Sequence, residues 1–250
     1  MTIGQTAILG IIQGLTEFFP VSSSAHLLLL RPILSLGEAN LWLDVILHGG
    51  TWLAVIIYLI PHYSRIINYP PILLKIIVAT IPAGLSGLLL EEIIENQFRE
   101  QWIYSVLLLI ILGIVFIYAR EKGDKSLESI SWLEALFIGL AQSLALFPGV
   151  SRSGITLLVA LSLGMKKKEA VLFSFFLSLT TIGGAFALGL LEIGDSAYSW
   201  LEVGTGFVTS FVSGLFACVY LLKIVEKGGL KPFGYYRILF GIFVLGWMLF

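Results

Sequence analysis

The chain has 250 residues, of which 58% are hydrophobic and 12% are charged. Soluble domains are about 45–50% apolar and about 25% charged, so this composition excludes a soluble globular protein and indicates an all-α integral membrane protein. The net charge of −1, without a long basic block, argues against a nucleic-acid partner, and the single Cys218 excludes an intramolecular disulfide.

In chain order, a short apolar segment (3–19) ends at Pro20 and is followed by a cluster of serines. A cleavable signal peptide is the alternative, but residues 2–16 carry no lysine or arginine and Glu17 closes the apolar run. A second short segment (131–147) also ends next to a proline. The remaining apolar runs have the length of about 20 residues that a membrane-spanning helix needs: 41–60, 71–90, 102–119, 169–191, 198–223 and 234–250.

The two short segments are related by an internal repeat with an offset of 129 residues. The informative matches are Gly10/Gly139, Gln13/Gln142, Ser22/Ser151 and Ser24/Ser153. We interpret the chain as one membrane domain of two repeats, about 1–120 and 131–250, each with a special hairpin followed by three spans. An odd number of crossings in each half makes the repeats inverted relative to one another.

The distribution of positive charge predicts that the second hairpin is re-entrant, meaning that it leaves the membrane on the side where it entered. With six spans, one side of the membrane then collects most of the basic residues, including Lys166–Lys168 and Arg237, while the other holds Arg31 and Arg99. For the first hairpin the prediction comes from the repeat. The expected location is the plasma membrane, with several spans, two re-entrant hairpins and extracytoplasmic termini.

Re-entrant backbone is tolerated at membrane depth only inside protein or along a wet cavity. We therefore expect the hairpin tips, 20–26 and 148–154, to line a polar cavity. A helix follows each tip, at roughly 24–34 and 154–164, and a helix N-terminus directs N–H groups and a positive dipole end outward. Two such ends facing each other would form an anion site.

Residues of the second tip suit a phosphate ligand. The guanidinium of Arg152 has a planar fork of donors that matches phosphate oxygens. Hydroxyls from neighbouring residues would add donors, and glycines would let the backbone approach an oxyanion closely. The residues expected to bind the anion with Arg152 are Ser151, Ser153, Gly154 and Thr156, with Gly149 before them.

The first tip offers groups for phosphoryl transfer: a carboxylate, hydroxyls and a histidine. The candidates are Glu17, Ser22, Ser23, Ser24 and His26, with Gln13 one helical turn before Glu17. Structural alternatives remain open, because the serines could cap a helix, Arg152 could form a structural ion pair with Glu17, and His26 could sit at the rim of the hairpin. Asp44 and His48 could form a relay, although an interfacial role is the simpler interpretation.

With these residues in view, the chain resembles the undecaprenyl-pyrophosphate phosphatase family, the bacitracin-resistance proteins. The resemblance rests on QGLTE (13–17), FFPVSSSAH (18–26) and PGVSRSGIT (148–156) and extends over essentially the whole chain. It implies a membrane hydrolase that converts undecaprenyl diphosphate to the monophosphate carrier lipid, recycling that lipid for cell-envelope glycopolymers, with a divalent cation such as Mg²⁺ or Ca²⁺.

Carried over residue by residue, the resemblance implies Glu17 as the essential carboxylate and metal ligand, Ser23 as nucleophile, His26 as acid/base and Arg152 within the diphosphate clamp. Water activated by Glu17 is the other candidate nucleophile. Expected partners are a polyprenyl diphosphate lipid, the membrane and a second copy of the chain in a homodimer. A secondary transporter or flippase of an anionic lipid is the alternative function, because inverted repeats with broken helices are typical of that class too.

Overall fold

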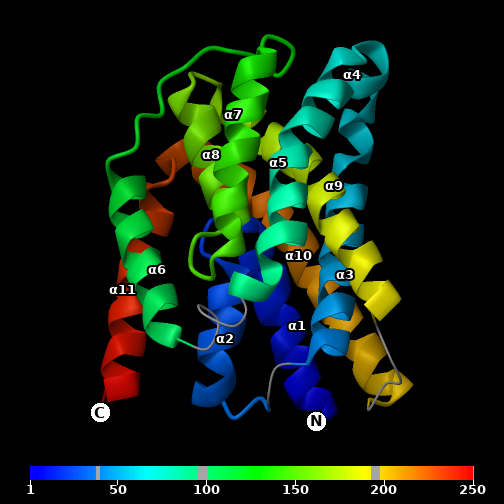
Figure 1. Cartoon of the computed structure of the whole chain (residues 1–250), viewed down its shortest axis with the longest axis vertical. Helices are drawn as coiled ribbons and strands as arrows, with labels where there is room; N and C mark the ends of the chain where they lie inside the picture. The colour runs from blue at the N-terminus through cyan, green and yellow to red at the C-terminus, as the bar shows by residue number, and fades with distance from the viewer. Residues whose placement is uncertain (38–39, 95–100, 193–197, 250) are drawn as a thin grey trace.

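The computed structural model describes residues 1–37, 40–94, 101–192 and 198–249, and in these ranges the regular elements are helices (Figure 1). Arg99, one of the charges used to predict the topology, lies outside them. The helices are α1 (Ile3–Phe18), α2 (Ser23–Ile33), α3 (Leu41–Leu59), α4 (Tyr63–Asn68), α5 (Pro71–Ile94), α6 (Trp102–Ile117), α7 (Trp132–Ser143), α8 (Arg152–Ser162), α9 (Lys167–Glu192), α10 (Trp200–Gly228) and α11 (Lys231–Leu249), with 3₁₀ turns at Ile60–His62 and Leu144–Leu146.

Several helices are long and apolar enough to cross a membrane, which confirms the predicted class of a helical, multi-pass membrane protein. In the described residues there are five: Leu41–Asn68, Pro71–Leu90, Lys167–Leu191, Trp200–Gly228 and Lys231–Leu249. The sixth expected span corresponds to α6, which has 16 residues. At a rise of about 1.5 Å per residue it is shorter than the roughly 30 Å hydrocarbon layer, so the count of six spans stays a prediction.

The offset of 129 residues that relates the sequence motifs also relates the helix boundaries. Thr2 and Ser131, which differ by this offset, form capping boxes at the starts of α1 and α7. The helices that begin at positions separated by the same offset are α1 and α7, α2 and α8, α5 and α10, and α6 and α11. The repeat is thus a repeat of local structure as well as of residue types.

Each hairpin packs against a helix from the other half of the chain. Helix α1 lies along α10 and α7 lies along α5, while α3 contacts α9 and α6 contacts α11. Exchanging the halves reproduces the same set of pairings, as a twofold relation between them requires. The largest buried cluster lies among these helices and includes Phe18 and Phe175, whose rings meet edge to face with centroids 5.6 Å apart.

The hairpins reach the middle of the bundle from opposite ends (Figure 1). Helices α1 and α2 join at the inner end of the first hairpin, while α7 and α8 descend toward it from the other end, and both chain termini lie at the same end. One sequence interpretation needs correction here. Arg237, assigned to the basic face, lies within α11 and is 0% exposed.

The repeated glycines permit the close crossing of each hairpin helix with its partner. A Cβ on Gly10 would lie 2.6 Å from the carbonyl oxygen of Gly206 on α10. A Cβ on Gly139, its counterpart in the repeat, would lie 2.4 Å from the carbonyl oxygen of Ala79 on α5. A backbone carbonyl cannot move aside for a methyl group as the end of a flexible side chain can, so both positions favour glycine.

We expect Gly139→Ala to destabilise the protein, because the new methyl group overlaps the α5 backbone. Overpacking of this kind costs about 1–3 kcal/mol. Gly84→Ala is the matched control on α5, since nothing lies within 4 Å of the Cβ it would add. Thermal unfolding of the purified protein in detergent should show a lower midpoint for Gly139→Ala alone. Equal midpoints for the two variants would contradict the proposed close crossing.

Candidate functional site

The residues that start α2 and α8 share an unusual backbone conformation. Ser22 has φ of 73° and Ser151 has φ of 69°, and they occupy equivalent positions of the repeat. Positive φ is uncommon outside glycine and costs free energy, so it persists only where surrounding contacts hold it. In each tip the hydroxyl also lies next to that of the serine two residues on, at 3.2 Å for Ser22 and Ser24 and 3.3 Å for Ser151 and Ser153.

The two tips are hydrogen-bonded to each other. The Gly149 N–H donates to Ser22 Oγ at 3.1 Å, and Ser153 Oγ donates to the Phe19 carbonyl at 3.2 Å. Some hydroxyls predicted to bind the anion therefore also join the hairpins. The starts of α2 and α8 therefore lie close together.

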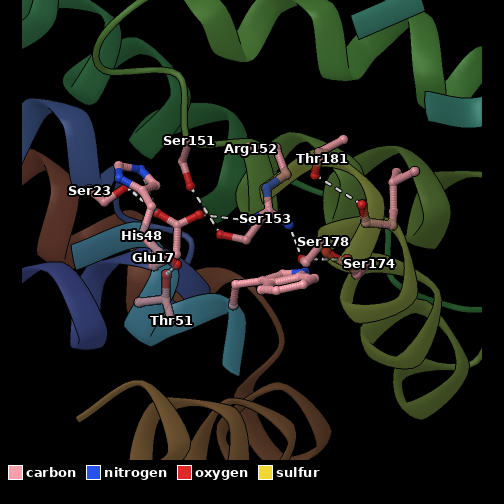
Figure 2. Close-up of polar contacts among 12 residues, drawn as sticks. Glu17, Ser23, His48, Thr51, Ser151, Arg152, Ser153, Ser174, Ser178 and Thr181 are labelled. Atoms are coloured by element: carbon pink, nitrogen blue, oxygen red, sulfur yellow. Dashed lines mark hydrogen bonds and ion pairs between the residues drawn. The ribbon is translucent and has the colours of Figure 1, made fainter. Parts of the chain in front are cut away.

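Glu17, in the last turn of α1, is at the centre of the polar contacts at this junction (Figure 2). Its Oε2 accepts hydrogen bonds from Ser23 Oγ at 2.7 Å and from Gln13 Nε2 at 3.1 Å. Its Oε1 accepts one from Arg152 at 2.7 Å. The structure thus brings together three of the four predicted catalytic residues, from α1, α2 and α8.

The Arg152 side chain contacts both the first hairpin and α9. Besides Glu17, its guanidinium contacts the hydroxyl of Ser178, which in turn donates to the Ser174 carbonyl at 2.8 Å. The ion pair is largely buried, with 8% of the Glu17 side chain and 14% of the Arg152 side chain exposed. A guanidinium carries five N–H donors, so pairing with Glu17 and Ser178 leaves capacity for an anionic ligand.

His48, on α3, is a neighbour of Glu17, whereas the sequence favoured an interfacial role for it over a relay with Asp44. Its Nε2 lies 3.9 Å from Glu17 Oε2, and 34% of its side chain is exposed. Its Nδ1 lies 2.7 Å from the Asp44 carbonyl oxygen, which can only accept, so Nδ1 carries the hydrogen. Nε2 therefore faces Glu17 with a lone pair when the ring is neutral. The Asp44 carboxylate itself pairs with Arg31.

His26 points away from this junction, toward α11. Its Nδ1 lies 2.8 Å from the Ser22 carbonyl oxygen and its Nε2 lies 2.8 Å from the Tyr236 hydroxyl. The ring stacks on Phe240 with centroids 4.2 Å apart. Both ring nitrogens are thus engaged, Nδ1 with the first tip and Nε2 with α11, and His26 is not among the hydrogen-bond partners of Glu17 or Arg152.

Two further predicted residues have packing roles. Thr156 Oγ1 lies within 3.1 Å of the Arg152 and Ser153 carbonyls and 2.8 Å from Ser174 Oγ, one turn behind the tip. A Cβ on Gly154 would lie 2.7 Å from the Phe116 ring, so this glycine accommodates an aromatic side chain.

Ser174 and Ser178 contact Thr156 and Arg152, but they are not among the residues predicted from the sequence. Their spacing of four residues in an otherwise apolar helix places both hydroxyls on one face, and this polar stripe was the available signal.

The residues around Glu17 offer oxygen ligands of the kind that a divalent cation accepts. Within the described ranges, no cluster of three or more histidine, cysteine, aspartate or glutamate side chains could form a metal site by itself. Gln13 Oε1 is buried without a hydrogen-bond partner beside the Glu17 carboxylate. One carboxylate plus an amide oxygen suits Mg²⁺, which is usually bound by one or two carboxylates together with phosphate oxygens and water.

Comparison with known proteins gives one consistent family. The sequence profile of the family described as "Bacitracin resistance protein BacA" matches residues 6–243. "Undecaprenyl-diphosphatase 1" of Pseudoalteromonas translucida is 40% identical, with 97% of each chain covered. "Undecaprenyl-diphosphatase" of Caldicellulosiruptor bescii is also 40% identical, over 100% of this chain and 98% of that protein. The protein of that name from Methanococcus maripaludis is 39% identical over 95% of this chain and 97% of its own.

The buried pair of Glu17 and Arg152 should be energetically coupled. Removing one partner leaves an uncompensated buried charge, which costs about 3–5 kcal/mol, and some exposure of Arg152 favours the lower end. We expect Arg152→Met to unfold at a lower temperature than the double variant Glu17→Gln/Arg152→Met, in which neither charge remains. Thermal unfolding of the wild type, both single variants and the double variant measures this coupling. Additive effects would show that the two side chains are independently solvated.

Proposed function

Since this chain belongs to the bacitracin resistance protein BacA family, we propose that it hydrolyses undecaprenyl diphosphate to undecaprenyl monophosphate and inorganic phosphate. The product is the carrier lipid on which cell-envelope glycopolymers are assembled, so the reaction recycles that carrier. The observation that carries the proposal is the convergence of Glu17, Ser23 and Arg152 where the two hairpin tips meet. The names of relatives at about 40% identity over the full chain agree with this reaction.

In this proposal both tips bind the diphosphate, and residues of the first hairpin perform the chemistry. Arg152 places a permanent positive charge at the N-terminus of α8, where the helix dipole also favours an anion. Hydroxyls of both tips then donate to the phosphate oxygens. The residues proposed to bind substrate are Gln13, Ser22, Ser24, Ser151, Ser153, Gly154 and Thr156, the last two by shaping the tip from behind.

Two nucleophiles fit the arrangement around Glu17. In the first route Ser23 Oγ transfers its proton to Glu17 and attacks the terminal phosphorus, which expels undecaprenyl monophosphate, and water then hydrolyses the phosphoserine. In the second route Glu17 takes a proton from a water molecule that attacks directly. The 2.7 Å hydrogen bond from Ser23 to Glu17 supports the first route.

Acid/base catalysis by His26 remains a prediction. The 2.8 Å contact of His26 Nδ1 with the Ser22 carbonyl suggests that the ring also supports the strained start of α2. His48, with Nε2 3.9 Å from Glu17, is a second candidate for handling the proton. We also propose a divalent cation, held by Glu17 and Gln13 with the diphosphate, which would supply charge neutralisation as the anhydride breaks.

We further propose six spans with two re-entrant hairpins, arranged as inverted repeats of about 1–120 and 131–250 with both termini extracytoplasmic. Support comes from the common offset of the helix starts and from the exchange of partners between α1 with α10 and α7 with α5. A homodimer stays a prediction. The transporter alternative needs only an anion site and does not account for the carboxylate beside Ser23.

Purified protein should release inorganic phosphate from undecaprenyl diphosphate in detergent. We expect EDTA to abolish release and Mg²⁺ or Ca²⁺ to restore it. Ser23→Ala should lower kcat by more than about 10⁴-fold if Ser23 is the nucleophile, because losing acid/base help alone costs about 10²–10⁴-fold. Ser210→Ala, a buried serine on α10, is the control. A drop of a few-fold in Ser23→Ala assigns the attack to water, and absence of phosphate release from the wild type refutes the hydrolase.

The proposed topology can be tested by labelling single cysteines in a Cys218→Ala background. Lys168, near the start of α9, and Ser199, the residue that caps α10, are both exposed. They flank one proposed span, so Lys168→Cys should react with a membrane-impermeant thiol reagent from the cytoplasmic side and Ser199→Cys from the outer side. Reaction of both cysteines from one side would be incompatible with the proposed fold in the membrane.

A further inference from the structure

Arg237 is the largest fully buried side chain in the described structure, and the sites considered above leave it without a role. It projects from α11, where its guanidinium donates to five carbonyl oxygens. These belong to Pro20 in the first tip, Gly149 and Val150 in the second tip, and Leu108 and Leu109 in α6. Among the described residues, no carboxylate forms an ion pair with it.

Three of these carbonyls, those of Pro20, Gly149 and Val150, lie in the tips outside any helix, whereas those of Leu108 and Leu109 lie within α6. A helix that ends inside an apolar protein exposes its last carbonyls, and each unpaired group costs several kcal/mol in hydrocarbon. Arginine is suited to this place because it presents several donors from one rigid plane. The Phe116 ring lies under the guanidinium, 5.1 Å from its carbon, and adds a cation–π contact.

The same contacts fix the direction of the tip N–H groups. In a trans peptide unit the N–H points opposite to the C=O, so a carbonyl held on Arg237 also orients the N–H of the following residue. Binding of Pro20 orients the Val21 N–H, and binding of Val150 orients the Ser151 N–H at the start of α8. Arg237 therefore holds peptide units of both tips through their carbonyl groups.

We propose that Arg237 is a positioning residue: it clamps the two hairpin tips to one another and so sets the relative placement of Glu17 with Ser23 on one tip and Arg152 on the other. No other described arginine contacts backbone of both tips. A displacement of about 1 Å in a reacting group can lower the rate about 100-fold, so holding the two tips in a fixed relative position would keep kcat high. The kinetic part of this inference rests on the proposed phosphatase function, whereas the geometric part does not.

The kinetic test compares Arg237→Lys and Arg237→Met with Arg65→Met. Arg65 is the control because it pairs with Glu128 and Glu169 away from the tips. Arg237→Lys keeps the charge but reaches fewer carbonyls, so we expect a folded protein with kcat lowered by about 10- to 100-fold and little change in KM. Its effect should shrink in an Arg152→Lys background, where the clamped geometry is already impaired.

The geometric test measures the distance between the hairpins without any substrate. Spin labels on Leu34→Cys at the end of α2 and Ser162→Cys at the end of α8, in a Cys218→Ala background, report on the angle between the two hairpins. Pulsed EPR should give a narrow distance distribution for the otherwise wild-type protein and for Arg65→Met, and a broadened or shifted one for Arg237→Met.

Wild-type protein that releases no phosphate would refute the proposed function and leave the EPR comparison to decide the role of Arg237. Unchanged distance distributions together with wild-type kcat would overturn the clamp. An equal loss of activity in the wild-type and Arg152→Lys backgrounds would also overturn it. Failure of both Arg237 variants to fold would assign this side chain to assembly of the bundle instead of to positioning of the tips.

Discussion

Two helical hairpins end inside the apolar bundle, and the backbone groups at their tips must find partners there. The structure meets this constraint by bringing the tips together, so that Gly149 N–H pairs with Ser22 Oγ and Ser153 Oγ pairs with the Phe19 carbonyl. Arg237 donates hydrogen bonds to further backbone carbonyl oxygens of both tips. The backbone groups at the interrupted helix ends need hydrogen-bond partners, and this requirement also brings the polar residues of the two repeats together.

The candidate site combines a duplicated framework with unlike chemistry. Both tips have a serine with positive φ, a second serine two residues later and a following helix of 11 residues. The repeat then diverges, because Leu146 occupies the position equivalent to Glu17, and Arg152 the position equivalent to Ser23. One tip thus supplies a carboxylate and a hydroxyl, whereas the other supplies a permanent cation, and the two are complementary only when they meet.

The proximity of opposite charges would allow a buried ion pair and the proposed substrate site to coincide. Glu17 and Arg152 stabilise each other in the absence of a ligand, which lowers the cost of burying either alone. A diphosphate would compete with Glu17 for the guanidinium and release a carboxylate oxygen at the same time. The structural and functional interpretations of Arg152 that the sequence left open are in this way compatible.

The sequence by itself determined the helical membrane class, the repeat and the identity of the tips. Apolar runs, prolines followed by serines, and the match of Gln13 with Gln142 are local patterns that need no knowledge of packing. The starts of α2 and α8 fell within two residues of those expected, because helix N-termini are set by nearby residues.

Only the tertiary structure decided which side chains face each other across the hairpins. It placed His48 beside Glu17 and turned His26 toward Tyr236, although both histidines lie on helices whose positions were well predicted. It also moved Arg237 from an expected membrane face into the centre of the protein. The direction of a side chain around a helix depends on the rotation of that helix against its neighbours, and in an apolar chain nearly every face is hydrophobic, so the sequence carries little information about that rotation.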